Sequence, residues 1–291
     1  MSKIVFLGTG TSSGVPLVSC LLKNDCETCN DTKKKNSKNK RGNTSLVIKY
    51  KKKNILIDVG KFFYQSAIEW FPCHNITSID SILITHDHFD AIGGMDDLRD
   101  FTNQIEHQIP IYLRKSDLKT VNEIYPYLVD PQKSSAGFQK HQILMFKGGG
   151  IAKLKFIELK DSETPIELFG LKITPLEVFH GKKYTCLGFM FGKVVYLSDV
   201  SLIPEKIFQQ IKECDILILD CLNDKKSHPS HFTYQESLEM ILKINPKESY
   251  FIGMTHEMNH ENYTENLKEW NLKNKQNLKL SYDGLSLDVD L

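Results

Sequence analysis

The chain lacks any marked excess of charge, with 37 lysine and arginine residues against 36 aspartate and glutamate residues among its 291. Proteins that bind nucleic acid through a polybasic surface carry a clear positive excess, so the balance disfavours that class. Apolar residues are not scarce: they make up 41% of the chain and can supply a folded core. A long disordered protein is therefore excluded, and we expect one globular domain over residues 1–291.

Long apolar runs are also lacking. No segment approaches the roughly 20 apolar residues of a membrane-spanning helix, and residues 1–7 do not contain the apolar stretch of a signal peptide. These observations favour a cytoplasmic protein without a membrane partner. In a reducing compartment, seven cysteines, three of them close together near the start, favour thiols and a metal site over disulfides.

A nucleotide-binding fingerprint is missing as well. Gly8, Gly10 and Gly14 follow a short apolar strand, but their spacing misses the dinucleotide pattern and no Gly-Lys-Ser/Thr follows. These glycines therefore indicate a tight turn. The basic stretch at residues 33–41 is typical of a solvated loop, with a contact to nucleic acid as the less favoured alternative.

Apolar patterns predict many strands and helices. Residues 46–50 and 55–59 predict a hairpin. Further strands are predicted at residues 4–7, 79–85, 109–113, 154–159, 171–178, 187–191, 194–197, 216–219 and 250–255. Helices are predicted at residues 61–70, 95–101, 116–125, 204–211, 233–244 and 263–270. A hairpin-rich first half followed by alternating strands and helices predicts an α/β fold of two sheets covered outside by helices.

The predicted strand 79–85 runs into a group of metal-binding side chains. His86, His88 and Asp90 follow it at alternate positions, where side chains of an extended segment point the same way. Imidazole nitrogens and carboxylate oxygens are ligands of Zn²⁺, and their burial without a partner is costly. The group therefore indicates a metal site.

Three more such side chains follow other predicted strands. His180 comes after residues 171–178, Asp199 after residues 194–197, and His256 after residues 250–255. The carboxyl ends of strands in an open sheet converge on one edge, so we expect these three residues to join the group at His86.

These residues form a pattern that resembles the metallo-β-lactamase fold superfamily. Its Thr-His-x-His-x-Asp-His motif matches residues 85–90, and Phe-Leu-Gly-Thr-Gly-Thr-Ser-Ser-Gly-Val-Pro at residues 6–16 and Tyr-Asp-Gly-Leu at residues 282–285 extend the likeness over nearly the whole chain. The resemblance implies an αββα sandwich, two mixed sheets flanked by helices. His-Pro-Ser-His at residues 228–231 and Met-Thr-His at residues 254–256 look most like the branch that hydrolyses phosphoribosyl 1,2-cyclic phosphate.

The resemblance implies a role for each candidate residue. Six of them would bind one or two catalytic ions, Zn²⁺ or Mn²⁺: His86, His88 and His180 the first, Asp90 and His256 the second, and Asp199 both. Asp58 would orient a ligand from behind. Lactamases of the superfamily carry cysteine at the bridging position, so Asp199 argues against β-lactam hydrolysis.

One position departs from the pattern. The superfamily has a histidine directly after the aspartate of its motif, where this chain has Ala91. Asp90, Asp199 and His256 could still hold a second ion with weaker affinity. The sequence therefore leaves open one or two catalytic ions, and also a non-catalytic protein that only binds a phosphorylated ligand.

The implied reaction is hydrolysis of a small, cyclic phosphodiester. Two ions about 3.5 to 4 Å apart would lower the pKa of a bound water to roughly 7 and so supply the attacking hydroxide. The departing alkoxide needs a proton, and His231 resembles the family residue in that role. A tRNA 3′ processing nuclease, with RNA as partner, and a hydrolase of thioesters or lactones are alternatives. A homodimer is left open.

Three cysteines near the start of the chain form a second candidate metal site. Cys20, Cys26 and Cys29 stand where the resembling phosphodiesterases carry a tighter cysteine cluster, which binds structural zinc with a histidine close behind the last catalytic ligand. His260 is the candidate for that fourth ligand. We therefore predict one structural Zn²⁺, with reduced loop thiols as the alternative.

Overall fold

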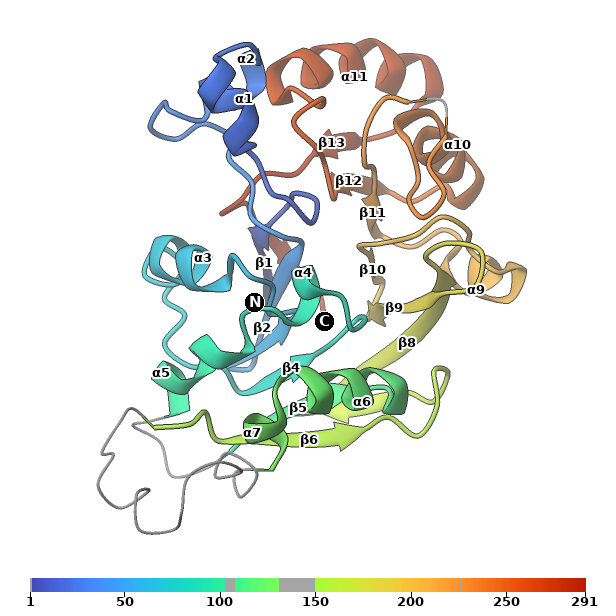
Figure 1. Cartoon of the computed structure of the whole chain (residues 1–291). Helices are drawn as coiled ribbons and strands as arrows, with labels where there is room; N and C mark the ends of the chain where they lie inside the picture. The colour runs from blue at the N-terminus through green and yellow to red at the C-terminus, as the bar shows by residue number, and fades with distance from the viewer. Residues whose placement is uncertain (1, 103–107, 131–149, 226) are drawn as a thin grey trace.

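Two seven-stranded sheets form the centre of the molecule (Figure 1). The structure is a computed structural model that describes residues 2–102, 108–130, 150–225 and 227–291. In spatial order the first sheet consists of β14 (Ser286–Val289), β1 (Ser2–Gly8), β2 (Ser45–Tyr50), β3 (Lys53–Ile57), β4 (Ser81–Leu83), β5 (Ile109–Leu113) and β6 (Leu154–Glu158). The second consists of β13 (Leu278–Leu280), β12 (Glu248–Ile252), β11 (Ile216–Asp220), β10 (Val194–Leu197), β9 (Thr185–Phe191), β8 (Leu171–Phe179) and β7 (Ile166–Leu168).

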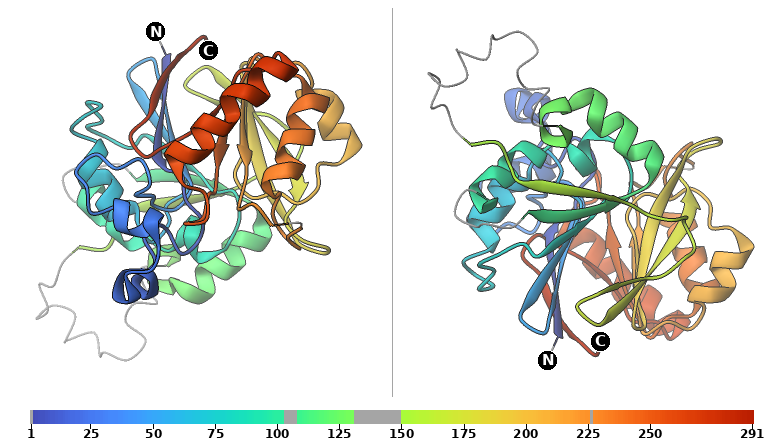
Figure 2. Two further views of the ribbon diagram at one scale, coloured as in Figure 1. Left: turned by 90° about the horizontal axis from the view of Figure 1, so that it is seen from above. Right: turned by 90° about the horizontal axis from the view of Figure 1, so that it is seen from below.

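Helices cover the outer side of each sheet (Figure 2). The first sheet is covered by α3 (Phe63–Trp70), α4 (Phe89–Ile92), η1 (Met95–Leu98), α5 (Arg99–Thr102), α6 (Lys115–Ile124) and α7 (Pro126–Val129). The second is covered by α9 (Glu205–Ile211), α10 (Tyr234–Ile244) and α11 (His260–Asn274). This arrangement confirms the predicted αββα sandwich. None of the described helices has the length and apolarity needed to cross a membrane.

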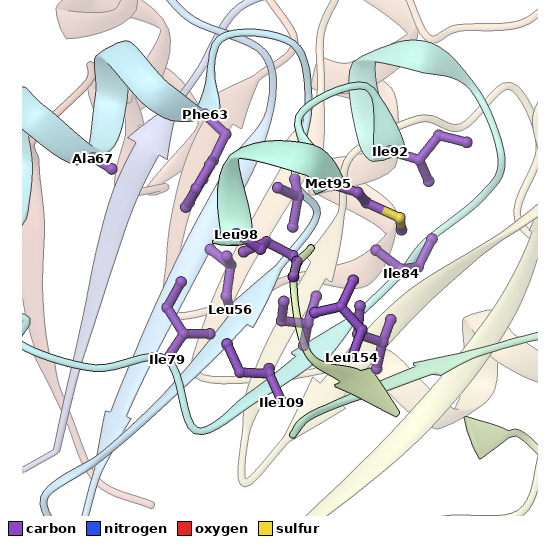
Figure 3. Packing of buried hydrophobic residues seen from close by; sticks show 14 of the residues in the cluster. Leu56, Phe63, Ala67, Ile79, Ile84, Ile92, Met95, Leu98, Ile109 and Leu154 are labelled. Atoms are coloured by element: carbon purple, nitrogen blue, oxygen red, sulfur yellow. The ribbon is translucent and has the colours of Figure 1, made fainter. Parts of the chain in front are cut away.

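Strands in the middle of each sheet are apolar on both faces because both faces are buried. In β1, Ile4 and Phe6 face the other sheet, whereas Val5 and Leu7 face the helices. Figure 3 shows the helix side of the first sheet, where Phe63 of α3 and Leu98 of η1 pack with residues of the strands. The alternation of inward and outward side chains follows from the pleat of a strand. Three apolar layers therefore hold the sandwich together.

The two sheets repeat one connection scheme, which places several strand ends together. In each sheet the neighbours at one side are antiparallel, and those at the other side are parallel: β3 to β6 in the first, β10 to β13 in the second. Side chains of the candidate site lie at the carboxyl ends of β4, β8, β10 and β11 or a few residues beyond them. Ligands commonly bind at the carboxyl ends of parallel strands.

Three predictions about local structure need correction. The predicted strand 250–255 ends at Ile252, so Gly253 and not His256 stands at the strand end. No helix was predicted in the cysteine region, which contains α1 (Val18–Lys23) and α2 (Glu27–Asp31). The stretch 33–41 is not wholly solvated, because Arg41 is only 2% exposed.

Candidate metal centre

His86, His88 and His180 converge at the carboxyl ends of β4 and β8. One ligand nitrogen from each lies within 4.8 Å of the others, and the ring centroids of His86 and His88 are 4.6 Å apart. His88 lies just before the first residue of α4, in extended backbone, so it can turn its ring back toward His86. The structure therefore brings together the three histidines predicted for the first ion.

Hydrogen bonds behind the rings fix which nitrogen faces the site. Nδ1 of His86 lies 2.7 Å from Oγ1 of Thr85, and Thr85 in turn donates from Oγ1 and its backbone N–H to Asp58, both at 2.8 Å. Nδ1 of His180 lies 2.7 Å from the carbonyl oxygen of Ser230. Asp58 thus reaches His86 through Thr85, and Nε2 of both histidines is left for a ligand.

Two buried atoms at this point have no partner in the described part of the chain. They are Nε2 of His86 and Oδ2 of Asp199, which follows β10. Burial, together with the neighbouring imidazoles, lowers the pKa of His86 to about 3, so its ring is neutral and able to coordinate a cation. Unpaired buried polar atoms are costly, and a divalent cation would satisfy both. His86, His88 and His180 form one ligand group, and Asp199 joins His180 and His231 in a second, so a divalent ion at the shared His180 would have these side chains around it.

Asp90 lies at the edge of the same group. Its Oδ1 is 4.0 Å from Nε2 of His86. Burial and the charge of Asp199 raise the pKa of Asp90 to about 6, because two carboxylates close together disfavour each other's ionisation. A cation between them would remove that repulsion.

His231 lies against the other side of His180, with 4.7 Å between the ring centroids. Its Nδ1 is 2.7 Å from Oδ2 of Asp220, the last residue of β11, and 3.7 Å from Oδ1 of Asp199. Burial opposes a charge on His231, but Asp220, Asp199 and Asp90 outweigh burial and raise the pKa of His231 to about 9. At neutral pH this ring carries a proton beside the metal centre.

Two residues near the centre were missed by sequence reasoning. Asp220 directly follows the predicted strand 216–219, so the strand-end argument applied to His180 and Asp199 would have found it. Tyr184 stacks on the ring of His88 at a centroid distance of 4.8 Å and an interplanar angle of 6°, and its hydroxyl contacts Asp87. No spacing signal points to Tyr184, because it reaches the site from the turn between β8 and β9.

His256 does not join the histidine centre. Its Nδ1 lies 3.3 Å from Sγ of Cys26 and 3.7 Å from Sγ of Cys20, and Cys29 completes a group of four ligand atoms within 4.8 Å. Zinc–ligand bonds of about 2.0 to 2.3 Å in a tetrahedron set neighbouring ligands roughly 3.5 Å apart, so this group fits Zn²⁺. The structure thus has His256, and not His260, as the fourth member of this group, and no ligand group among the described residues joins His256 to Asp90 or Asp199.

His260 instead supports the buried guanidinium of Arg41. Its Nδ1 lies 3.3 Å from Nη2 of Arg41, and its backbone N–H donates to Asn39. Burial and the charge of Arg41 lower the pKa of His260 to about 3, so its neutral ring can accept from the guanidinium. Arg41 also donates to Thr9 and to the carbonyl of Ser281, which ties the basic stretch to the glycine-rich turn.

The fold and the centre together define a metal-binding sandwich of the metallo-β-lactamase kind. Residues 53–254 match the family model described as "Beta-lactamase superfamily domain", so the chain belongs to that superfamily, as the sequence predicted. An octanoyltransferase of Porphyromonas gingivalis is 30% identical over 290 residues, which are 99% of this chain and 52% of that protein. The chain thus spans about half the length of this curated relative.

Solved structures agree with this assignment. A diphosphatase from the PhnP family is 29% identical, with a TM-score of 0.81 over 100% of this chain and 99% of that one. Zn²⁺-bound PqqB of Methylobacterium extorquens is 16% identical, with a TM-score of 0.72 over 99% and 100% of the two chains. Human tRNase Z, short form, is 16% identical, with a TM-score of 0.63 over 99% and 100%. The latter two support the fold alone.

Proposed function

We propose that this protein is a metal-dependent hydrolase that acts on a small phosphodiester, with a cyclic ribose phosphate as the first candidate. The observation that carries the proposal is the His231–Asp220 pair beside His180 and Asp199. A proton donor next to a cation site suits a reaction in which an alkoxide leaves phosphorus. The 29% identity to a PhnP-family diphosphatase supports phosphorus chemistry.

The ion would be held by His86, His88, His180 and Asp199. When bound, a divalent ion supplies a water of lowered pKa and offsets negative charge on phosphoryl oxygens. The protein's own contribution is orientation: Thr85 fixes the ring of His86, and the Ser230 carbonyl fixes that of His180. Fixed ligands keep the site in its working geometry before substrate arrives.

His231 would protonate the leaving oxygen. Its Nδ1 is bonded to Asp220, whereas no hydrogen bond among the described residues uses its Nε2. The side chain is 15% exposed, so a substrate can reach it. Asp220 would hold the ring in one orientation and favour its protonated form, as a buried carboxylate does for a catalytic imidazole.

Turnover of two substrates tests this proposal. Metal-loaded protein should hydrolyse a cyclic ribose phosphate and a generic aryl phosphodiester, and His86→Ala should do neither. Binding of the cyclic ester without turnover of either substrate would favour the non-catalytic alternative. Turnover of a thioester or lactone but of no phosphodiester would contradict the proposal.

A nuclease is the second candidate, and one surface favours it. A cavity of about 870 Å³ is lined by several lysines of the basic stretch, among them Lys33, Lys35 and Lys38, and by the rings of Trp70 and Tyr282. Lysines beside aromatic rings suit a single-stranded nucleic acid. Against this, Lys34 and Lys40 are paired with Asp31 and Glu69.

Salt separates the two candidates. A protein that makes several phosphate contacts loses affinity by about 10³-fold or more between 50 and 200 mM salt. A small cyclic ester makes few such contacts, so its KM should change far less. A steep salt dependence with an RNA substrate, together with weak activity on small esters, would favour the nuclease.

A further inference from the structure

A second ion in the histidine centre would need ligands of its own. Superfamily members with two ions use an imidazole directly after the aspartate of the motif and another after a late strand, and this chain has Ala91 and a displaced His256 at those places. Ala91 is 1% exposed and belongs to the apolar cluster that also contains Ile92 and Met95. A methyl group offers no ligand atom.

The late strand β12 ends without an imidazole. Gly253 is the residue directly after Ile252, and a Cβ built on it would lie 2.6 Å from Oδ1 of Asp220. Its φ of +80° lies in the left-handed region, which favours glycine. A histidine at this strand end would clash with Asp220 unless Asp220 moved, so the position favours glycine.

His256 cannot return to the centre without leaving the cysteines. It stands three residues beyond Gly253, and its Nδ1 points at Cys26 and Cys20. Between them, Met254 is fully buried and bridges to Gly10, which fixes the chain on its way to His256. The imidazole therefore belongs to the cysteine cluster.

His231 is the remaining imidazole near the centre. Its Nδ1 is 2.7 Å from Asp220, and in the proposed function, on which this step rests, its Nε2 gives a proton to the leaving oxygen. The group formed by His180, Asp199 and His231 shares His180 with the three histidines, and Nδ1 of His180 faces the Ser230 carbonyl, so its one free nitrogen can bind only one ion. A second ion would then be left with the carboxylates of Asp90 and Asp199.

We propose that the centre binds a single divalent ion through His86, His88, His180 and Asp199, and holds no second ion at Asp90. Two-ion members of this superfamily clamp both the attacking and the leaving oxygen with metal. In this chain side chains, and not a second ion, would stabilise the leaving oxygen. The inference concerns metal binding alone, so it can be tested without any substrate.

Metal counting and electron paramagnetic resonance test the proposal together. Protein stripped with a chelator is given one equivalent of Zn²⁺ per chain, which the thiolates of the cysteine cluster select, and then excess Mn²⁺, desalted and analysed for both metals. We expect one Mn²⁺ per chain, with the spectrum of an isolated ion, besides the zinc of the cysteine cluster. Two Mn²⁺ per chain, or a spectrum of two exchange-coupled ions, would overturn the proposal.

Variants assign each ion to its site. His88→Ala should remove the Mn²⁺ and leave the zinc, and Cys26→Ser should do the reverse. Asp90→Asn should leave the count of Mn²⁺ at one. A second, weakly bound Mn²⁺ that the wild type holds and Asp90→Asn loses would contradict the inference. Circular dichroism of each variant verifies that the fold is intact, and His180→Ala replaces His88→Ala if the latter does not fold.

Discussion

The histidine centre and the cysteine cluster both draw on residues far apart in the chain, but they differ in what holds those residues. His86, His180 and Asp199 stand one to three residues after the ends of β4, β8 and β10, strands whose side chains are mostly buried. Cys20 lies on α1, which buries no residue, and Cys26 caps the five-residue α2. The fold positions the histidine centre, whereas the cysteine cluster depends on its own ligand contacts. Loss of the first should cost activity, and loss of the second should cost stability.

The largest effect is expected for His86→Ala. The variant loses a ligand that Thr85 and Asp58 hold in place, and with it the ion. Turnover of any substrate should fall below detection. Without the ion the reaction loses the several kcal/mol by which the ion stabilises charge in the transition state, and it also loses the activated water. The melting temperature should change little, because His86 follows a strand whose own residues form the core.

His74→Ala is the matched control, because His74 lies in neither ligand group. It should keep both turnover and metal. Activity of His86→Ala close to that of the wild type, with metal still bound, would refute the ligand assignment.

His231→Ala should slow a cyclic ribose phosphate by about 10²- to 10⁴-fold, the usual contribution of a general acid. An aryl ester should be much less affected, since its phenolate leaves without a proton. Asp220→Asn should show the same substrate pattern with a smaller loss, because it keeps the hydrogen bond and removes the charge. Steady-state rates on both substrates measure the effect.

The ratio of the rate losses on the two substrates tests the role of His231. Equal losses on both substrates would assign His231 to phosphate binding or metal support. No loss on either would make it an ordinary surface histidine.

Cys26→Ser should release one zinc ion per chain and lower the melting temperature. A cost of about 2 to 3 kcal/mol corresponds to roughly 3–5 °C in a chain of this size. Metal analysis and calorimetry measure the two effects, and Cys73→Ser, at an exposed cysteine, is the control. Full retention of zinc would return these cysteines to unligated thiols.

The smallest effect is expected for His260→Ala, which tests whether His256 or His260 binds the zinc. His260→Ala should keep the zinc and cost about 1 to 3 kcal/mol of unfolding free energy, since the Arg41 guanidinium loses one buried acceptor. His256→Ala should lose the zinc. Zinc loss in His260→Ala with retention in His256→Ala would reverse the assignment.

The same contrast explains which features could be predicted from the sequence. His86, His88, His180 and Asp199 were found because apolar runs locate strands, and strand ends converge. Even so, β12 ends three residues before the predicted end, so Gly253 and not His256 follows the strand. His256 lies 236 residues from Cys20 and His260 lies 219 residues from Arg41, and no periodicity encodes such contacts.

Anomalous diffraction from crystals soaked in Mn²⁺ locates each ion and its ligands. We expect one manganese peak, bound by His86, His88, His180 and Asp199, and zinc alone at Cys20, Cys26, Cys29 and His256. A manganese peak bound by His256, or none among the three histidines, would contradict this expectation.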